Sequence, residues 1–374
     1  MSQILWRVAE HEPLTERDWD PTLAREAIRA IVADAEAAGD EGGWPGHPHD
    51  DVGADRRLCS LYLGGAGVIW ALHALGASLD APAAIAGVLR RYREAPDPNE
   101  PYPPSLLLGE TGMLVVADAV GAAAADRGRL RELVRANREH PTWELLWGSP
   151  GTILAARACG LEEEWRESAE LLYGRWDEST DMWTGEMYGS PQDYIGPGHG
   201  FAGNVHALRG LVGEDVLRAR VARLLNRTAA RQDGLVNWPP RDRPLSEQTA
   251  KMRVQWCHGA PGIVTTLGDL MPLDLATCGG ELTWRAGPLR KGSGLCHGTA
   301  GNGYAFLKLH EVTGDPRWLE RARRFAMHAI EQVERERVAL GRGRYTLFTG
   351  DVGVALYLRA CLDGGWGFPI LDSL

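Results

Sequence analysis

The segment HGTAGNGYAFLKLHEVTG, residues 297–314, contains the pattern that decides the fold: a G-x-x-G motif followed by an apolar helical stretch. Six other segments repeat it: LGGAGVIWALHALG (63–76), LGETGMLVVADAVG (108–121), WGSPGTILAARACG (147–160), HGFAGNVHALRGLVG (199–213), HGAPGIVTTLGDL (258–270) and TGDVGVALYLRACL (349–362). The leading glycines of successive copies are 39 to 59 residues apart, which leaves room for a second helix in each interval. The repeat therefore predicts paired helices along nearly the whole chain.

The second helix of a pair is amphipathic, as DPRWLERARRFAMHAIEQVERER (315–337) shows. Asp315 can cap this helix and Pro316 suits its first turn. Apolar residues from Trp318 to Val333 recur at spacings of four and three, and the opposite face is charged. We therefore expect an inner ring of apolar helices inside an outer ring of amphipathic ones, an all-α (α/α)7 toroid.

Closure of this ring requires a helix from the beginning of the chain, because no outer helix follows the seventh copy. PTLAREAIRAIVADAEAAG, about residues 21–39, is amphipathic and can fill that place, which predicts a single domain over residues 1–374. The weakest outer segment is DLATCGGELTWRAG (274–287), where a glycine pair predicts a short or broken helix. The repeated glycines are expected to provide turns with positive φ and close backbone approach.

Composition excludes several classes of partner. The 374 residues carry a formal net charge of −10, and the pI is about 5.6, which disfavours binding to nucleic acid or to an anionic membrane. No apolar run reaches the roughly 20 residues of a membrane-spanning helix, and the N-terminus lacks the apolar core of a signal peptide. We expect a cytoplasmic protein, whose six cysteines bind metal or are buried rather than paired in disulfides.

Three copies place histidine directly before the first glycine: His199, His258 and His297. Cysteine precedes two of these histidines, as Cys257 in QWCHGAPG and Cys296 in GLCHGTAGN. Equivalent positions of neighbouring repeats lie at the same end of a ring, so these side chains can converge.

Cys257, Cys296 and His297 together match a zinc site with one open coordination position, as catalytic zinc sites have. His258 is left out of the ligand set, because a fourth protein ligand would close that position. The other four cysteines are expected to be packing residues.

VQWCHGAPG, GLCHGTAGNGYAFL and GPGHGFAGN resemble the signature segments of the lanthionine cyclase (LanC) family, over essentially the full chain. The chain is more similar to the LanC-like proteins of eukaryotes than to lantibiotic cyclases, because the third copy reads WELLWG and Lys291 precedes LCHG. The closing segments FTGDVG and GWGFPILDSL fit the same branch.

The resemblance implies that the two cysteines and the histidine bind one zinc ion, which activates a substrate thiol. It also implies that His199 is the catalytic acid or base. Glu144 of WELLWG stands where lantibiotic cyclases carry aspartate. It could orient His199, take a proton itself, or be a solvated carboxylate at the rim.

Basic residues near the zinc motif suggest how a substrate is held. Lys291, with Arg290 beside it, and Arg342 and Arg344 upstream of the seventh copy could form an anion site in an otherwise acidic protein. By resemblance, this site would bind the carboxylates of glutathione or a substrate phosphate, although ordinary surface charge also explains the arginines. Tyr194, in the Gly- and Pro-rich segment GEMYGSPQDYIGPG, could border the substrate entrance.

The leading hypothesis is zinc-dependent thioether formation. A thiol, such as glutathione or a peptide cysteine, adds to dehydroalanine or dehydrobutyrine in a peptide or protein. One alternative is a lanthipeptide cyclase acting within a biosynthetic cluster, and another is a non-catalytic scaffold that binds zinc or glutathione. A further alternative is a carbohydrate-active enzyme on a similar α/α barrel. Such an enzyme needs a carboxylate pair and no thiolate metal site, so the two C-H-G motifs argue against it.

Overall fold

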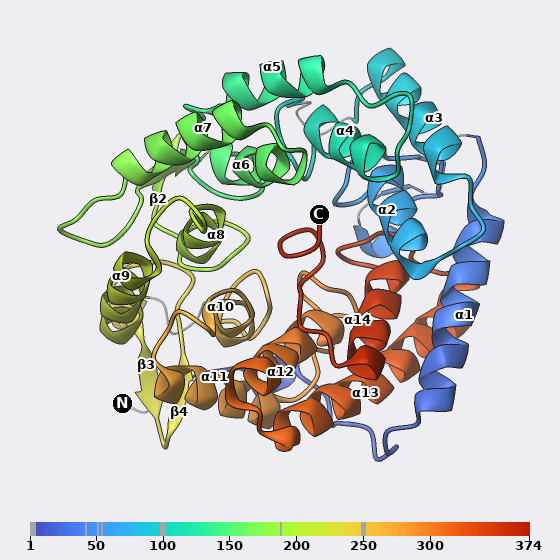
Figure 1. Ribbon diagram of the computed structural model, residues 1–374. Helices are drawn as coiled ribbons and strands as arrows, with labels where there is room; N and C mark the ends of the chain where they lie inside the picture. The colour runs from blue at the N-terminus through green and yellow to red at the C-terminus, as the bar shows by residue number, and fades with distance from the viewer. Residues whose placement is uncertain are drawn as a thin grey trace.

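The computed structural model describes residues 5–41, 43–50, 52–53, 55–97, 102–187, 189–247 and 252–374. Within these ranges the chain forms two concentric rings of helices, seen along the ring axis in Figure 1. The inner helices are α2 (Gly65–Leu75), α4 (Glu110–Ala119), α6 (Ser149–Ala158), α8 (Phe201–Ala207), α10 (Ala260–Leu267), α12 (Thr299–Thr313) and α14 (Asp351–Asp363). The outer helices are α1 (Pro21–Ala38), α3 (Ala81–Glu94), α5 (Arg127–Asn137), α7 (Glu162–Gly174), α9 (Glu214–Thr228), α11 (Leu273–Ala286) and α13 (Pro316–Leu340).

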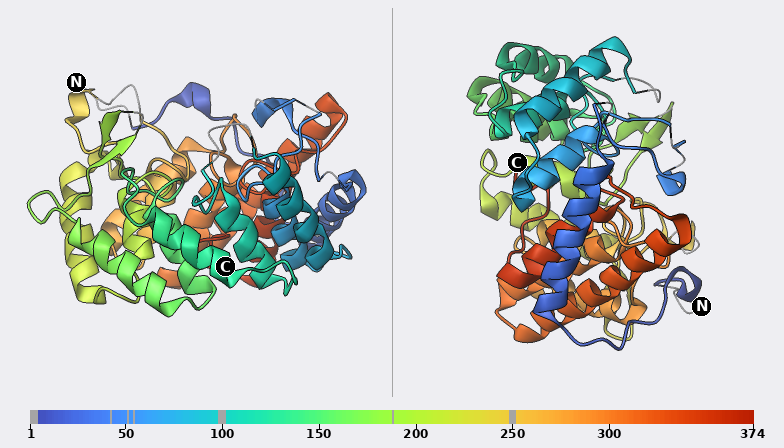
Figure 2. Two further views of the ribbon diagram at one scale, coloured as in Figure 1. Left: turned by 90° about the horizontal axis from the view of Figure 1, so that it is seen from above. Right: turned by 90° about the vertical axis from the view of Figure 1, so that its right-hand side faces the viewer.

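The inner ring is closed. Each inner helix packs against the next one along the chain, and α14 packs back against α2. The predicted N-terminal helix is α1, and it packs against α14, so it completes the outer ring. The predicted all-α toroid is therefore confirmed (Figures 1 and 2).

Close backbone approach explains the G-x-x-G motif. A Cβ on the second glycine would lie closer than 3.0 Å to the carbonyl oxygen six residues earlier. This holds for every copy, at Gly67, Gly112, Gly151, Gly203, Gly262, Gly301 and Gly353. The expected positive φ is wrong for most of the leading glycines: of the seven, Gly259 alone has a left-handed φ, at 108°.

Outer helices begin differently from inner ones. Asp20, Asp80, Asp126 and Asp315 cap α1, α3, α5 and α13 through their side chains, whereas each inner helix begins after a glycine. The prediction of a broken outer helix at residues 274–287 is wrong, because α11 runs unbroken through Gly279 and Gly280. A Cβ on Gly280 would collide with Leu309 and crowd Trp318, so this glycine allows α11 to pack closely against α12 and α13.

Short elements interrupt the helical pattern. Strands β1 (Gly185–Met187) and β2 (Ser190–Gln192) form one antiparallel pair, and β3 (Ala230–Gln232) and β4 (Leu235–Asn237) form another. Single 3-10 turns lie at η1 (Val8–Glu10), η2 (Pro48–Asp50) and η3 (Leu245–Glu247). Among the described residues, no helix combines the length and apolar character needed to span a membrane.

Candidate metal centre and active site

Three loops meet at one end of the ring, namely those that precede α10, α12 and α14. The backbone N–H of Cys257 donates to the carbonyl of Cys296 at 3.1 Å, and the N–H of Cys296 donates to the carbonyl of Phe348 at 2.7 Å. Equivalent residues of successive repeats are therefore tied together by their backbones. This arrangement brings Cys257 and Cys296 together although they are 39 residues apart in the chain.

Cys257, Cys296 and His297 form the cluster that the sequence predicts, with their ligand atoms all within 4.8 Å of one another. Both cysteines are buried and His297 is half-buried. Gln255 donates its side-chain N–H to Cys257 Sγ at 2.9 Å. Across the described ranges, no other group of three or more His, Cys, Asp or Glu residues is arranged to hold a metal ion.

The side chains of Cys257 and Cys296 form a hydrogen bond with each other. The hydrogen bond from Cys296 lowers the pKa of Cys257 well below its ordinary value, with His297 adding to the effect. The same contact, together with burial, raises the pKa of Cys296. Two soft sulfur donors and one imidazole are one of the known ligand sets of catalytic zinc sites, so the residues present fit a zinc ion.

His199 and Glu144 form a second pair of side chains, supplied by the loops before α8 and α6. Nδ1 of His199 lies 3.1 Å from Oε2 of Glu144, and the glutamate side chain is 1% exposed, so it is not a solvated rim carboxylate. Burial alone would lower the pKa of His199, but the hydrogen bond and charge of Glu144, with help from Cys257, raise it above 6.5. Because Glu144 faces Nδ1, Nε2 is the nitrogen left for a substrate proton.

Glu144 is itself held rigidly. Its carboxylate accepts hydrogen bonds from the backbone N–H groups of Leu146, Trp147 and Gly148, in the turn just before α6. Trp143, the residue before it, has a φ of 44°, which is unusual for a residue with a side chain. This strain occurs beside the His199 partner, where a fixed carboxylate direction matters.

His258 and Tyr194 surround His199. The rings of His199 and His258 stack with their centroids 5.4 Å apart, and the Tyr194 ring lies 6.0 Å from His199 and 5.3 Å from His258. Burial lowers the pKa of His258, which favours a neutral imidazole. Tyr194 thus lies against the predicted catalytic histidine, in the connection that the sequence associated with the entrance.

The family model for lanthionine synthetase C-like proteins matches residues 8–366, nearly the whole chain. This chain belongs to the lanthionine synthetase C-like family. Two curated relatives are each 37% identical to it. A zebrafish (Danio rerio) protein named glutathione S-transferase LANCL1 matches over 210 residues, 53% of this chain and 50% of the relative, and the Arabidopsis thaliana LanC-like protein GCL1 over 123 residues, 29% and 28%.

The matched stretches thus span half or less of these curated relatives. Among solved structures, nisin cyclase superposes with a TM-score of 0.60 and 14% identity, covering 91% of this chain and 94% of its own. At that identity the superposition shows a shared fold.

One residue of this LanC-like site was missed by sequence reasoning. Tyr62 precedes the first copy at the position that Cys257 and Cys296 occupy in their own copies. Its hydroxyl hydrogen-bonds with Cys296, and burial together with the neighbouring cysteines raises its pKa well above 10, so it stays a neutral hydrogen-bond donor. Aligning the seven copies by register, rather than searching them for metal ligands, would have found it.

The sequence predicts that Trp256 packs against the wall of the site, but it does not identify the residue that Trp256 contacts. Trp256, next to Cys257, stacks on Phe368 with centroids 4.5 Å apart and planes 4° from parallel. Phe368 lies in the segment after α14, which runs toward the centre of the ring (Figure 1). The sequence GWGFPILDSL gave no signal for this contact, because it joins residues more than a hundred positions apart.

The predicted cationic residues lie in the loops before α12 and α14, in different environments. Lys291 is exposed, and its charge acts on Cys296. It borders a cleft of about 500 Å³ that is also lined by Ala9, Glu10, Arg253, Gln255, Leu289 and Arg290. Arg342 is half-buried, and its charge makes a minor addition to burial, the main cause of the lowered pKa of His47. Arg344 is buried in an ion pair with Asp50.

Proposed function

We propose that this chain forms thioether bonds, using one zinc ion held by Cys257, Cys296 and His297. In the proposed reaction the sulfur of a thiol adds to the β-carbon of dehydroalanine or dehydrobutyrine in a peptide or protein. The S–H bond breaks, a C–S bond and an α-C–H bond form, and no redox reagent is needed. The observation that carries this proposal is the convergence of the three ligands beside the His199–Glu144 pair.

The bound metal would supply the charge that lowers the pKa of a coordinated thiol, so that its sulfur is nucleophilic at neutral pH. His199 would move the proton. Its Nδ1 faces Glu144, so Nε2 exchanges the proton between the thiol and the α-carbon, and its raised pKa keeps the imidazolium available near neutrality. Tyr62 would donate to the sulfur of Cys296 and help to fix the ligand.

The cleft beside Cys257 supports a thiol that carries carboxylates. Gln255 lines this cleft and also donates to Cys257 Sγ, so one side chain links the cleft to a predicted metal ligand. Lys291, Arg342 and Arg344 would bind the anionic groups, and Tyr194 would border the acceptor peptide. The name of the zebrafish relative favours glutathione as this thiol.

The test is to incubate zinc-loaded protein with glutathione and a dehydroalanine peptide, and to follow the adduct by mass spectrometry. We expect about one zinc per chain. His199→Ala should keep the metal and lose at least about 100-fold in rate, as expected for removal of a general acid or base. Cys296→Ala should lose both metal and activity, and Cys278→Ala, which changes a cysteine outside the cluster, should lose neither.

A metal-free protein that still formed the adduct would overturn the proposal. A second peptide, carrying both dehydroalanine and cysteine, separates the alternatives. Ring closure without glutathione transfer would identify a lanthipeptide cyclase. Retention of zinc without either product would identify a binding scaffold.

A further inference from the structure

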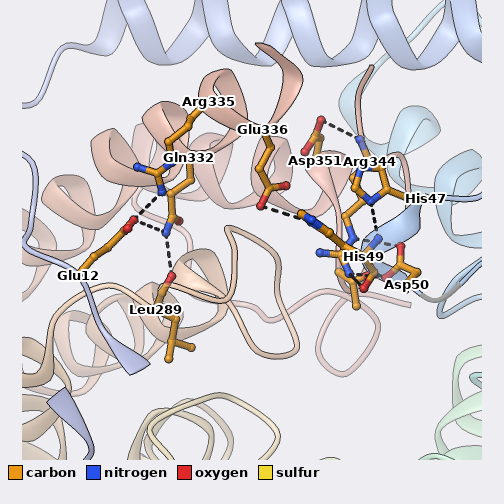
Figure 3. A network of polar contacts seen from close by, with 11 residues as sticks. Glu12, His47, His49, Asp50, Leu289, Gln332, Arg335, Glu336, Arg344 and Asp351 are labelled. Atoms are coloured by element: carbon orange, nitrogen blue, oxygen red, sulfur yellow. Dashed lines mark hydrogen bonds and ion pairs between the residues drawn. The ribbon is translucent and has the colours of Figure 1, made fainter. Parts of the chain in front are cut away.

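Arg344 is held in a fixed orientation by Asp50. Its Nε donates to Asp50 Oδ2 at 3.0 Å, and its Nη2 donates both to Oδ1 of the same carboxylate and to the carbonyl of His49 at 3.2 Å. Figure 3 shows the two side chains facing each other beside Asp351. Their exposed fractions are 6% for Arg344 and 3% for Asp50, so this is a buried ion pair.

Asp50 is in turn tied to the loop before α14, which is hydrogen-bonded to the loop that carries Cys296. Thr349 Oγ1 donates to Asp50 Oδ1 at 2.7 Å and lies 2.6 Å from Thr346 Oγ1. Thr349 follows Phe348, whose carbonyl accepts the N–H of Cys296. A short path of hydrogen bonds and backbone therefore connects the carboxylate of Asp50 with a predicted metal ligand.

The third nitrogen of the guanidinium, Nη1, has no hydrogen-bond partner among the described residues. A Cβ built on Gly292 would lie 3.8 Å from this nitrogen and 3.6 Å from Glu336 Oε1. Gly292 has a φ of 147°, which favours glycine, and it directly follows Lys291. Nη1 therefore lies beside the loop that contains Lys291 and Gly292.

The surrounding charges limit what this nitrogen can bind. Asp50 neutralises Arg344, His49 lies 3.9 Å from the carboxylate of Glu336, and burial with the nearby charge of Arg344 lowers the pKa of His47 to about 4. A dianionic phosphate is bound best by a guanidinium that has no other partner and donates two N–H groups to it. Arg344 has one N–H edge left, and this edge beside one lysine suits a single carboxylate better.

We propose that Asp50 is a positioning residue that aims Nη1 of Arg344 at one carboxylate of the thiol substrate, which Lys291 also contacts. This inference rests on the proposed function and decides between the two anions that the sequence left open. Asp50 acts only through Arg344. The competing explanation is that the ion pair merely stabilises the loop before α14.

A double-mutant cycle measured by binding tests the proposal without requiring turnover. Zinc-loaded wild type, Asp50→Asn, Arg344→Gln and the double variant are titrated calorimetrically with glutathione and with 2-mercaptoethanol, a thiol without carboxylates. We expect each single variant to raise the Kd of glutathione about tenfold, as for loss of a charged hydrogen bond, and to change the Kd of 2-mercaptoethanol less than about twofold. In the Arg344→Gln background, adding Asp50→Asn should change the Kd of glutathione less than about twofold.

Asp269→Asn is the matched control. Asp269 forms a two-bond ion pair with Arg209, at 2.7 and 2.9 Å, just after the C-terminal end of α10, whereas the metal loop precedes α10. This variant should leave both Kd values within about twofold of wild type, and zinc content and thermal unfolding confirm that each variant is folded. If Asp50→Asn alone does not fold, the Kd of glutathione is compared between Arg344→Gln and the double variant, which tests whether Asp50 acts only through Arg344.

Three results would overturn the inference: equal weakening of both thiols in Asp50→Asn, no change for either, or additive effects in the cycle. If the wild type bound 2-mercaptoethanol as tightly as glutathione, the proposed anion site would be excluded. The proposed activation of the thiol would not be affected by that result. Wild type that binds neither thiol would overturn the proposed function itself, and this inference with it.

Discussion

At the residue scale, the contact between Glu144 and His199 makes a prediction about pH. The pKa of His199 in the folded protein lies above 6.5, because the charge and hydrogen bond of Glu144 outweigh burial. The resulting stabilisation is fully present below about pH 6.5 and is lost as the pH rises through the raised pKa. We expect Glu144→Gln to lower the pKa of His199, measured by NMR titration of the imidazole protons, and to destabilise the protein most at low pH.

Part of that destabilisation should not depend on pH, because Glu144 also accepts hydrogen bonds from backbone N–H groups of the turn before α6. Glu132→Gln, which alters an exposed carboxylate of α5, serves as the control and should leave the titration of His199 unchanged. An unaltered His199 pKa in Glu144→Gln would show that the glutamate does no more than hold the turn before α6.

Some of these residues could be assigned from sequence and others could not. Cys257, Cys296 and His297 stood out because two copies repeat the same unusual C-H-G triplet. Tyr62 did not, because a tyrosine before an apolar helix is ordinary in composition and gains meaning only from its contact with Cys296. The ion pair of Arg344 with Asp50 could not be predicted from the sequence either, since the two residues are almost 300 positions apart in the chain.

At the element scale, the second glycine of each copy should tolerate no side chain. Gly112→Ala would place a Cβ closer than 3.0 Å to the carbonyl of Leu106 and to Leu61 Cβ, both buried and unable to move freely. We expect a loss of about 3 kcal/mol in the free energy of unfolding, at the upper end of the usual penalty for overpacking. Urea denaturation measures it.

Gly87→Ala supplies the matched control within an outer helix. In α3 the nearest atom to a Cβ at Gly87 is Arg90 Nη2, at 3.9 Å, so alanine meets no obstacle. Alanine should stabilise the protein by about 0.5–1 kcal/mol, because it has the higher helix propensity. Equal effects of the two substitutions would contradict the close-approach explanation of the repeat.

The same reasoning explains the failed prediction for α11. From the sequence, Gly279 and Gly280 are predicted to be helix breakers, although glycine inside a helix makes the free energy of helix formation only modestly less favourable. Contacts with Val264, Leu309 and Trp318 require small residues at those places, and the tertiary packing overrides the local preference.

At the scale of the whole molecule, the segment after α14 should stabilise both the ring and the metal site. Phe368, Ile370 and Leu371 are buried, and the carbonyl of Leu371 lies 3.0 Å from Nε2 of His206 on the opposite side of the ring. Lys308 on α12, 3% exposed, lies 3.8 Å from the centre of the Trp366 ring. This segment therefore joins helices that the chain order separates.

Deletion of residues 365–374 should lower the free energy of unfolding by several kcal/mol, since burial of each large apolar side chain contributes about 1.5–3 kcal/mol. Zinc affinity should fall as well, because Trp256 loses the ring on which it stacks. Phe368→Ala isolates the second effect: competition with a chromophoric chelator should show weaker zinc binding than in Trp366→Ala. Unchanged stability in the deletion would exclude a structural role for the segment.

The sequence by itself determined the number and pairing of the helices, the apolar inner and amphipathic outer faces, and the residues that could bind metal. These properties depend on local periodicity and on a repeated motif, and a comparison of the seven copies is enough to identify both. Only the tertiary structure decided that Glu144 is buried against His199, that Asp50 neutralises Arg344, and that Phe368 lies under Trp256. Such contacts join residues 55 to almost 300 positions apart, so they exist only once the ring has closed.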